Sequence, residues 1–203
     1  MSARAAFIDR DGVINVDRAY VYRREEFEFV SGVFEAVREL RRLGFIPVVV
    51  TNQSGIGRGV YTEDDFNALT DWMKQQFTAE GAPIDAVYYC PHHPSDALDD
   101  YRFVCDCRKP APGMLLAAAR DLDLELRRSV MFGDRVSDLE AARAAGIEHR
   151  FLLGTDGKHA PDTTLVTAGL HSASFRNLLD AVLSPDLQKL ARADQKMLSK
   201  ESS

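Results

Sequence analysis

Short apolar runs alternate with longer segments of helical periodicity along this chain, and this alternation restricts its possible folds more than any other feature. The apolar runs are residues 5–8, 45–50, 86–89, 129–132 and 150–153. Short runs without polar alternation are typical of strands buried on both faces of a parallel sheet. Strands that alternate with helices form right-handed βαβ units. We therefore expect an α/β fold with three layers around a central parallel sheet.

The segments between these runs carry residues that commonly begin or end a helix. Ser31 can cap a helix that continues to about residue 43, where Gly44 follows as a stop. Thr62 precedes three acidic residues, which favour the positive end of a helix running towards residue 77. Pro112 suits the first turn of a third helix. Gly146 follows a fourth helix, expected over residues 136–145.

The composition favours a single globular domain that needs no disulfides. The 203 residues are 45% hydrophobic, and a chain of this size buries roughly 70% of its unfolded surface. We expect one domain over residues 1–183 and a mobile tail over residues 184–203. The polar stretch 13–29 is expected to form a flap beside the first strand.

Charge and hydropathy argue against two classes of partner. The chain has 31 acidic and 25 basic residues, whereas broad nucleic-acid binding requires a basic face. No apolar run approaches the ~18 residues of a membrane span, and the N-terminus reaches Asp9 before any long apolar stretch. We therefore expect a cytoplasmic protein with no nucleic-acid or membrane partner. The lack of an evident exposed apolar stripe favours a monomer.

Polar residues that could take part in binding or catalysis follow the ends of the predicted strands. They are Asp9, Asp11, Thr51, Asn52, Lys109, Asp134 and Asp138. In open α/β sheets, ligands bind beyond the carboxyl ends of the strands. Clustered carboxylates repel one another unless a cation neutralises them, and Mg²⁺ favours a few carboxylates with water and substrate phosphate. Lys109 and Thr51 would then supply the ammonium and hydroxyl that a phosphoryl group in transit needs.

Each of these motifs alone also has a purely structural interpretation. D-x-D-G at residues 9–12 is most often a turn, G-D at 133–134 is ordinary loop chemistry, and C-R-K-P at 107–110 can be a surface basic patch. The glycine-rich segment 54–59 could expose backbone N–H groups to an anion, but it is a weak signal by itself. Their order and their placement at successive strand ends favour one common site.

The four motifs in this order resemble those of haloacid dehalogenase (HAD) superfamily phosphatases. The matching segments are F-I-D-R-D-G-V-I-N (7–15), V-V-V-T-N-Q-S-G (48–55), C-R-K-P (107–110) and G-D-R-V-S-D (133–138). Y-Y-C-P-H-H-P and V-C-D-C-R-K-P-A-P-G-M-L are similar to the D-glycero-D-manno-heptose 1,7-bisphosphate phosphatases, which group with histidinol-phosphate phosphatases. The resemblance covers about residues 4–180 and implies a HAD-like Rossmannoid fold.

The resemblance assigns roles to matching positions. Asp9 would attack phosphorus as the nucleophile, and Asp11 would be the general acid and base. Mg²⁺ would be held by the Asp9 and Asp134 side chains and the Asp11 backbone carbonyl. Thr51 and Lys109 would bind the transferring phosphoryl group. The other implied substrate contacts are Asp17, Arg18, Ala19, Tyr20, Asn52, Gln53, Ser54, Arg108 and Arg135.

Two positions depart from the pattern of the heptose phosphatases. Arg135 stands where those enzymes carry Lys, and Val13 replaces a frequent Thr. A guanidinium is a planar fork rather than a point charge. A shifted preference for the distal phosphate or the anomer would follow, with the chemistry of phosphoryl transfer unchanged.

The three cysteines fall within residues 90–107 and form a C-x-H-x₁₂-C-x-C pattern with His92. Cys90, Cys105, Cys107 and His92 would make the closed tetrahedral set of a structural Zn²⁺. His93 is the nearest competing ligand, and the family match favours His92. The alternative is three ordinary thiols beside an incidental histidine. A zinc would order the loop of residues 91–106, which leads directly to Arg108 and Lys109.

The leading functional hypothesis is a Mg²⁺-dependent phosphatase that acts on a small phosphorylated sugar. The resemblance implies hydrolysis of the C7 phosphate of D-glycero-D-manno-heptose 1,7-bisphosphate, in nucleotide-activated heptose biosynthesis. Histidinol phosphate is the alternative substrate. A non-catalytic binding protein on the same fold is the alternative of another class, but it would have lost the nucleophile. The intervals between motifs are too short for a large cap domain, so the flap and the zinc loop would supply specificity.

Overall fold

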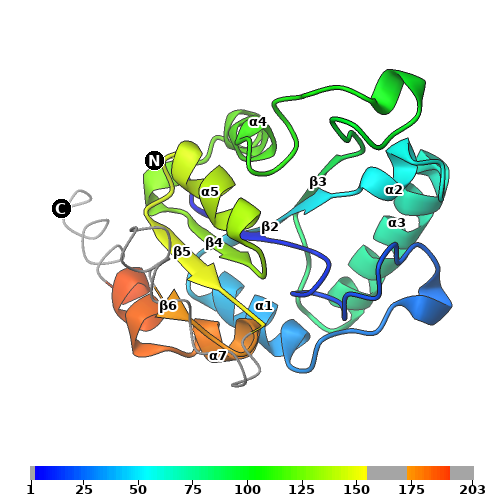
Figure 1. The fold of residues 1–203 in the computed structure, drawn as a ribbon. Coiled ribbons are helices and arrows are strands. Elements are labelled where there is room, and N and C mark those ends of the chain that lie inside the picture. The colour runs from blue at the N-terminus through cyan, green and yellow to red at the C-terminus, as the bar shows by residue number, and fades with distance from the viewer. Residues whose placement is uncertain (1–2, 155–172, 193–203) are drawn as a thin grey trace.

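A six-stranded, wholly parallel sheet forms the centre of the molecule (Figure 1). The computed structural model describes residues 3–154 and 173–192. The strands are β1 (Ala5–Ile8), β2 (Ile46–Asn52), β3 (Ala86–Cys90), β4 (Val130–Gly133), β5 (His149–Leu152) and β6 (Ala173–Ser174). Their order in the sheet is β3-β2-β1-β4-β5-β6. The predicted parallel sheet is confirmed, and β6 adds a strand too short to be recognised as an apolar run.

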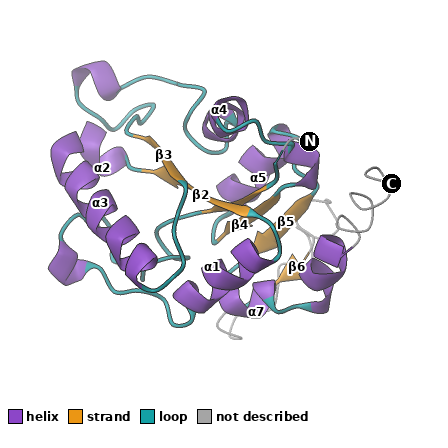
Figure 2. Cartoon of the chain, turned by 180° about the vertical axis from the view of Figure 1, so that it is seen from behind, coloured by secondary structure: helices purple, strands orange, loops and turns teal. Residues whose placement is uncertain are grey.

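The helices cover both faces of this sheet. They are α1 (Val33–Arg42), α2 (Ser54–Gly57), α3 (Glu63–Ala79), α4 (Gly113–Asp121), α5 (Val136–Ala144) and α7 (Leu178–Val182). Short 3-10 turns lie at Arg24–Glu26, Asp99–Tyr101 and Leu126–Arg128. Figure 1 shows α4 and α5 on one side of the sheet and α1 and α7 on the other. Seen from behind in Figure 2, α2 and α3 lie towards β3, and α7 lies towards β6.

Alternate residues of the central strands pack into two separate hydrophobic cores, one on each face of the sheet. In β1, Phe7 packs into the core beneath α4 and α5, whereas Ile8 packs into the core beneath α1, α3 and α7. In β4, Met131 and Phe132 divide between the two cores in the same way. Successive side chains of a strand point to opposite faces, so a strand covered on both faces has no polar positions. This is the physical reason for the continuous apolar runs.

The predicted helix starts are partly correct. Thr62 caps α3 in a reciprocal capping box: its Oγ1 accepts from the Asp65 N–H at 3.1 Å, and the Thr62 N–H donates to Asp65 Oδ2 at 2.9 Å. Pro112 immediately precedes α4. The prediction that Ser31 caps α1 is wrong. The residue before α1 is Gly32, with φ 81° in the left-handed region and no side-chain cap, a conformation that glycine adopts without steric cost.

The stretch 13–29 lies beside the site but is more than a polar flap. Val13, Ile14 and Val21 are at most 1% exposed, and Asn15 pairs with Phe29 in an isolated antiparallel bridge. These apolar residues anchor the segment to the core, and the residues between Val16 and Tyr20 remain exposed.

The segment after α7 contributes to the core as far as it is described. Residues 185–192 are helical, and Leu187 and Ala191 are fully buried in the core that contains α1. Residues 193–203 of the expected tail lie outside the described residues. Within the described ranges, only single helices and turns separate successive strands from β1 to β5, with α2 and α3 both between β2 and β3. No helix of the described ranges has the length and apolar character needed to cross a membrane.

Candidate active site

Three neighbouring elements bring Asp9, Thr51 and Lys109 together at one edge of the sheet. Asp9 follows β1 directly, Thr51 is near the end of β2, and Lys109 comes from the loop before α4. The Lys109 ammonium lies 2.8 Å from Asp9 Oδ1 and 2.6 Å from Asp138 Oδ1, and it donates to the Val50 carbonyl at 2.8 Å. Asp9, Thr51, Lys109 and Asp138 are each at most 6% exposed as residues. Their ion pairs therefore lie in a low-dielectric environment.

Burial and crowding raise the pKa of two carboxylates of this centre, Asp9 and Asp134. Burial raises the pKa of Asp9 to about 8, opposed by Lys109 and reinforced by Asp138 and Asp134. Burial and then Asp138 raise the pKa of Asp134 to about 6. The two carboxylates hold the pKa of Lys109 above its usual range in spite of burial. Such a centre favours a bound cation that neutralises the remaining negative charge.

The carboxylate oxygens of Asp9, Asp134 and Asp138 lie within 4.8 Å of one another. Asp134 Oδ1 is buried, and no hydrogen-bond donor reaches it from the described residues. A buried carboxylate oxygen without a partner is costly, and a divalent cation would satisfy it. Gly12 permits the close approach: at φ +88°, a Cβ there would lie 2.1 Å from Asp134 Oδ2. The donor set of oxygens fits Mg²⁺.

Asp11 is held by a chain of hydrogen bonds. Its carboxylate accepts from Arg10 Nη2 at 2.9 Å, from Asn15 Nδ2 at 3.0 Å and from Gln53 Nε2 at 2.9 Å. Gln53 also donates to Thr51 Oγ1 at 2.8 Å and accepts from the Tyr61 hydroxyl at 2.5 Å. The network holds Asp11 from several directions and connects it through Gln53 to the Thr51 hydroxyl.

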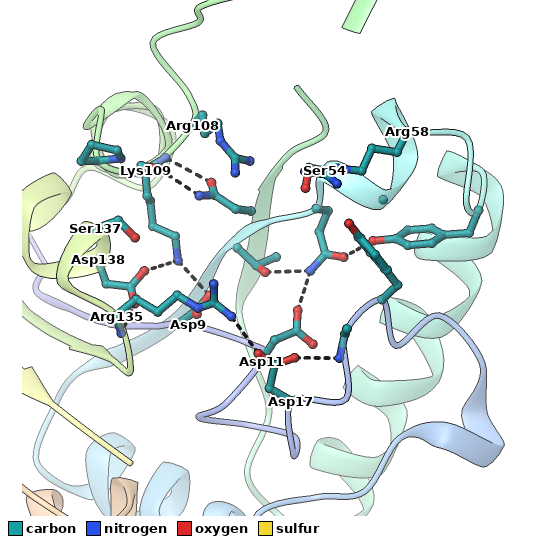
Figure 3. A pocket seen from close by; sticks show the side chains of 18 residues that line it. Asp9, Asp11, Asp17, Ser54, Arg58, Arg108, Lys109, Arg135, Ser137 and Asp138 are labelled. Atoms are coloured by element: carbon teal, nitrogen blue, oxygen red, sulfur yellow. Dashed lines mark hydrogen bonds and ion pairs between the residues drawn. The ribbon is translucent and has the colours of Figure 1, made fainter. Parts of the chain in front are cut away.

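A cavity of about 550 Å³ opens above these groups (Figure 3). Most of the predicted site residues line it: Asp9, Asp11, Asp17, Ala19, Tyr20, Thr51, Asn52, Gln53, Ser54, Arg108, Lys109 and Arg135. Arg18 does not, because its guanidinium pairs with Glu28 on the exposed side of the flap. Asp134 is also absent from the lining and lies behind Gly12 beside the other carboxylates.

The flap reaches the cavity through a strained tip. Ala19 and Tyr20 both have φ 55°, a left-handed conformation that is uncommon for residues with a side chain. Asp17 accepts from the Ala19 N–H at 3.0 Å and pairs with Arg135 Nη2 at 2.8 Å. The Asp17–Arg135 ion pair therefore links the flap to the N-terminus of α5.

The predicted zinc ligands form a tight cluster. His92 Nδ1 lies 3.2 Å from Cys107 Sγ, and the sulfur atoms lie 3.1 to 3.5 Å apart. A tetrahedron with Zn–S bonds of ~2.3 Å has edges of roughly 3.8 Å, so these atoms lie somewhat closer together than they would around a bound ion. Burial raises the pKa of Cys90 above its usual range, and a bound metal would favour the thiolate. The set of three sulfurs and one imidazole fits Zn²⁺.

His93, in the same loop, accepts a backbone hydrogen bond and does not join the cysteine cluster. Its Nδ1 accepts from the Asp96 N–H at 2.9 Å, which closes a turn within residues 93–96. His92, not His93, therefore lies with the cysteines. Arg108 Nη1 donates to the His92 carbonyl at 3.1 Å, so the position of this cation depends on the cluster. Lys109 is held through its backbone by a reciprocal pair of hydrogen bonds with the Asn52 amide, at 3.0 and 3.1 Å.

Several residues of the site received no role from the sequence. The sequence placed Asp138 in the carboxylate cluster, one helical turn from Asp134, but it did not predict that Asp138 is the main partner of Lys109. Arg10, Tyr61 and Arg58 also belong to the site or its support. Arg10 contacts the neighbouring Asp11, Tyr61 contacts Gln53 eight residues away, and Arg58 pairs with the distant Asp96, so no single spacing indicates these contacts.

Comparison with known proteins agrees with this geometry. A HAD-hydrolase-like family model matches residues 106–181. The D-glycero-β-D-manno-heptose-1,7-bisphosphate 7-phosphatase of Escherichia coli K12 is 48% identical over 161 residues, which cover 79% of this chain and 84% of that protein. The D-glycero-α-D-manno-heptose-1,7-bisphosphate 7-phosphatase of Burkholderia mallei is 51% identical over 153 residues, which cover 75% of this chain and 81% of that protein.

A solved structure gives the same relationship. The D,D-heptose 1,7-bisphosphate phosphatase of B. bronchiseptica, complexed with magnesium and phosphate, superposes with a TM-score of 0.74 at 33% identity. The match covers 88% of this chain and 96% of that one. With the fold, the ordered motifs and relatives near 50% identity in agreement, the chain belongs to the heptose-1,7-bisphosphate 7-phosphatase family of HAD hydrolases.

Proposed function

We propose that this protein hydrolyses the C7 phosphate of D-glycero-D-manno-heptose 1,7-bisphosphate and releases heptose 1-phosphate and inorganic phosphate. The observation that carries the proposal is the contact of Asp9 with Lys109 in a cavity that also contains Asp11. A buried nucleophile, a phosphate-binding ammonium and a second carboxylate for proton transfer are the parts that covalent phosphoryl transfer requires. The named activity of relatives near 50% identity supplies the substrate.

In the first step, an Asp9 carboxylate oxygen attacks phosphorus and the bond between phosphorus and the C7 oxygen breaks. Asp11 donates its proton to the departing C7 oxygen, so the sugar leaves as an alcohol. Lys109 and the Thr51 hydroxyl bind the phosphoryl oxygens, on which negative charge is spread. Asp138 keeps the Lys109 ammonium at the position where those oxygens arrive.

In the second step, water hydrolyses the aspartyl-phosphate. Asp11, now a carboxylate, removes a proton from the attacking water, and the bond between phosphorus and the Asp9 oxygen breaks to release phosphate. The contacts of Asp11 with Gln53 and Asn15 orient it for both proton transfers. Asp9 is regenerated as a carboxylate, which closes the cycle.

The Asp9 and Asp134 side chains and the Asp11 backbone carbonyl would hold Mg²⁺. The ion supplies charge neutralisation among the carboxylates and on the phosphoryl oxygens when bound. Cys90, His92, Cys105 and Cys107 would hold a structural Zn²⁺, supported by their mutual distances. The substrate contacts of the sugar would come from the flap, from residues 52–54 and from Arg108 and Arg135.

The test is phosphate release from the α and β anomers of heptose 1,7-bisphosphate, compared with histidinol phosphate. We expect Mg²⁺-dependent turnover of a heptose bisphosphate with a kcat/KM well above that of histidinol phosphate. Asp9→Asn should abolish turnover, because an amide cannot form the aspartyl-phosphate. Higher activity on histidinol phosphate would reject the substrate, and undiminished turnover by Asp9→Asn would reject the nucleophile.

A further inference from the structure

The cations that line the cavity are one ammonium, buried between two carboxylates, and three partly exposed guanidinium groups. Lys109 is shared between Asp9 and Asp138, and Arg135 pairs with Asp17. Arg108 and Arg58 also line the cavity. A bisphosphate brings a second anionic group that is not transferred, and guanidinium groups bind phosphate through paired, charge-assisted hydrogen bonds. Arg58 and Arg108 carry guanidinium groups suited to it.

Arg58 is weakly engaged where it stands. Its Nη1 lies 2.5 Å from Asp96 Oδ2 of the zinc loop, with the Asp96 side chain 65% exposed and that of Arg58 29% exposed. Such solvated ion pairs contribute little stability, so an incoming phosphate can compete with Asp96. The Arg58 Nε is buried with no hydrogen-bond partner in the described part of the chain. A turn of the guanidinium towards a ligand would satisfy that donor.

Arg58 and Arg108 lie on the same side of the cavity. Figure 3 shows both of them at the rim away from Asp9 and Asp11. Arg108 is fixed by its bond to the His92 carbonyl, and Arg58 closes α2 at its C-terminal end. Two separate elements thus direct cations to one region.

The flap covers this region from the other side. The Arg58 guanidinium lies 5.9 Å from the centre of the Tyr20 ring. Gly55 lets that ring approach α2, because a Cβ at residue 55 would lie 2.8 Å from Tyr20 Cδ1. The flap tip, α2 and the zinc loop therefore meet at Arg58.

We propose that Arg58 is a specificity-determining residue that binds the non-transferred phosphate of the sugar bisphosphate together with Arg108. The inference rests on the proposed function, since it concerns the second phosphate of the same substrate. Arg58 takes no part in bond breaking and makes the enzyme prefer a bisphosphate over a monophosphate. The zinc loop contributes through Asp96, which holds Arg58 at the rim while the cavity is empty.

The experiment compares heptose 1,7-bisphosphate with heptose 7-phosphate in steady-state kinetics. For Arg58→Ala, we expect kcat/KM on the bisphosphate to fall by about 10-fold or more, mainly through KM, as expected for loss of a charged hydrogen bond. Activity on the monophosphate should stay within about twofold. Arg58→Lys should recover part of the loss, because it restores the charge without the bidentate fork.

Arg41→Ala is the matched control. Arg41 forms a comparable ion pair with Asp85, outside the cavity, so its loss should leave the ratio of the two substrates unchanged. An equal loss on both substrates in Arg58→Ala, or no loss on either, would overturn the role of Arg58. If wild type hydrolyses neither heptose phosphate, the proposed function itself fails. Asp9-dependent turnover with an unchanged substrate ratio in Arg58→Ala rejects this inference alone.

Discussion

Lys109 shows how a centre rich in carboxylates can accept an anionic substrate. Its ammonium contacts two carboxylates and the Val50 carbonyl, so its position is fixed on three sides. The charge that it shares with Asp9 and Asp138 lowers the repulsion that these buried groups would exert on a phosphoryl group. Asp138 lines the cavity but is only 1% exposed, and its carboxylate is engaged by the Lys109 ammonium. Its contribution is the placement of Lys109.

Replacing Asp138 by Asn tests that role. The variant keeps the size of the side chain and an oxygen that can accept the Arg135 N–H, as Asp138 Oδ2 does at 3.0 Å. It removes the charge that holds Lys109, so we expect kcat to fall by roughly 10- to 100-fold, as for other residues that orient a catalytic group. Glu140→Gln, an exposed charge on the same helix, is the control. Equal kcat values for the two variants would contradict the assignment.

The raised pKa values of the carboxylates predict a pH-dependent affinity for Mg²⁺. The pKa of Asp9 is raised to about 8 and that of Asp134 to about 6, each mainly by burial. Both groups are more protonated as pH falls, and a proton on either competes with the ion. We expect the Kd for Mg²⁺ to rise by at least about tenfold from pH 8 to pH 6, which means weaker binding.

Isothermal titration calorimetry measures this effect directly. Titrations in two buffers of different ionisation enthalpy should also reveal protons released on binding near pH 7, because the carboxylates must ionise to hold the ion. An affinity that does not change with pH, with no proton release, would show that these carboxylates are ionised before Mg²⁺ binds.

At the scale of elements, the loop of residues 91–106 is held at both ends by backbone contacts that only glycine permits. A Cβ at Gly57 would lie 2.5 Å from the Pro91 carbonyl oxygen, and a Cβ at Gly113 would lie 2.4 Å from that of Asp106. The Gly113 N–H donates to the Asp106 carbonyl at 2.8 Å. Few buried apolar side chains lie between these points, so the order of the loop depends on the Cys/His cluster that joins its two ends.

Removal of zinc should therefore disorder the loop while the nucleophile remains. Constraining a loop of ~15 residues is worth ~3 kcal/mol, which corresponds to a loss of roughly 6–12 °C in Tm. We expect chelation to lower Tm in this range and to raise KM for the bisphosphate, because Arg108 and Arg58 lose their supports. Restoring Zn²⁺ should reverse both effects. Unchanged KM and Tm in the zinc-free protein would contradict the proposal.

At the scale of the whole molecule, the sequence predicted the sheet and the edge at which the site lies. The strands β1, β2 and β4 are buried on both faces, and this burial is why their sequences are continuous apolar runs. The strand-end rule then groups Asp9, Thr51 and Lys109 without any knowledge of their contacts. β6 was missed because two residues carry no periodic pattern, and the start of α1 because a left-handed glycine replaces a side-chain cap.

The sequence did not predict which residues the long arginine side chains contact. Arg18 was expected at the substrate and instead pairs with Glu28, whereas Arg58 lines the cavity without having been singled out. Both outcomes depend on how the flap and the zinc loop dock, which contacts between distant segments decide. Local spacing predicts the backbone position of such a residue but not the direction of a flexible guanidinium.

The segment after α7 is a part of the fold whose contribution can be measured against an internal control. Leu187 is fully buried with α1, and the adjacent Gln188 Nε2 donates to Glu39 Oε1 at 3.0 Å. Leu187→Ala should cost ~2–5 kcal/mol and lower Tm by roughly 4–20 °C, with kcat/KM unchanged at temperatures where the variant is folded. Leu183→Ala removes a side chain that is 58% exposed and should shift Tm little. Equal Tm values for the two variants would mean that the domain ends before residue 187, because a core side chain and an exposed one cannot contribute alike.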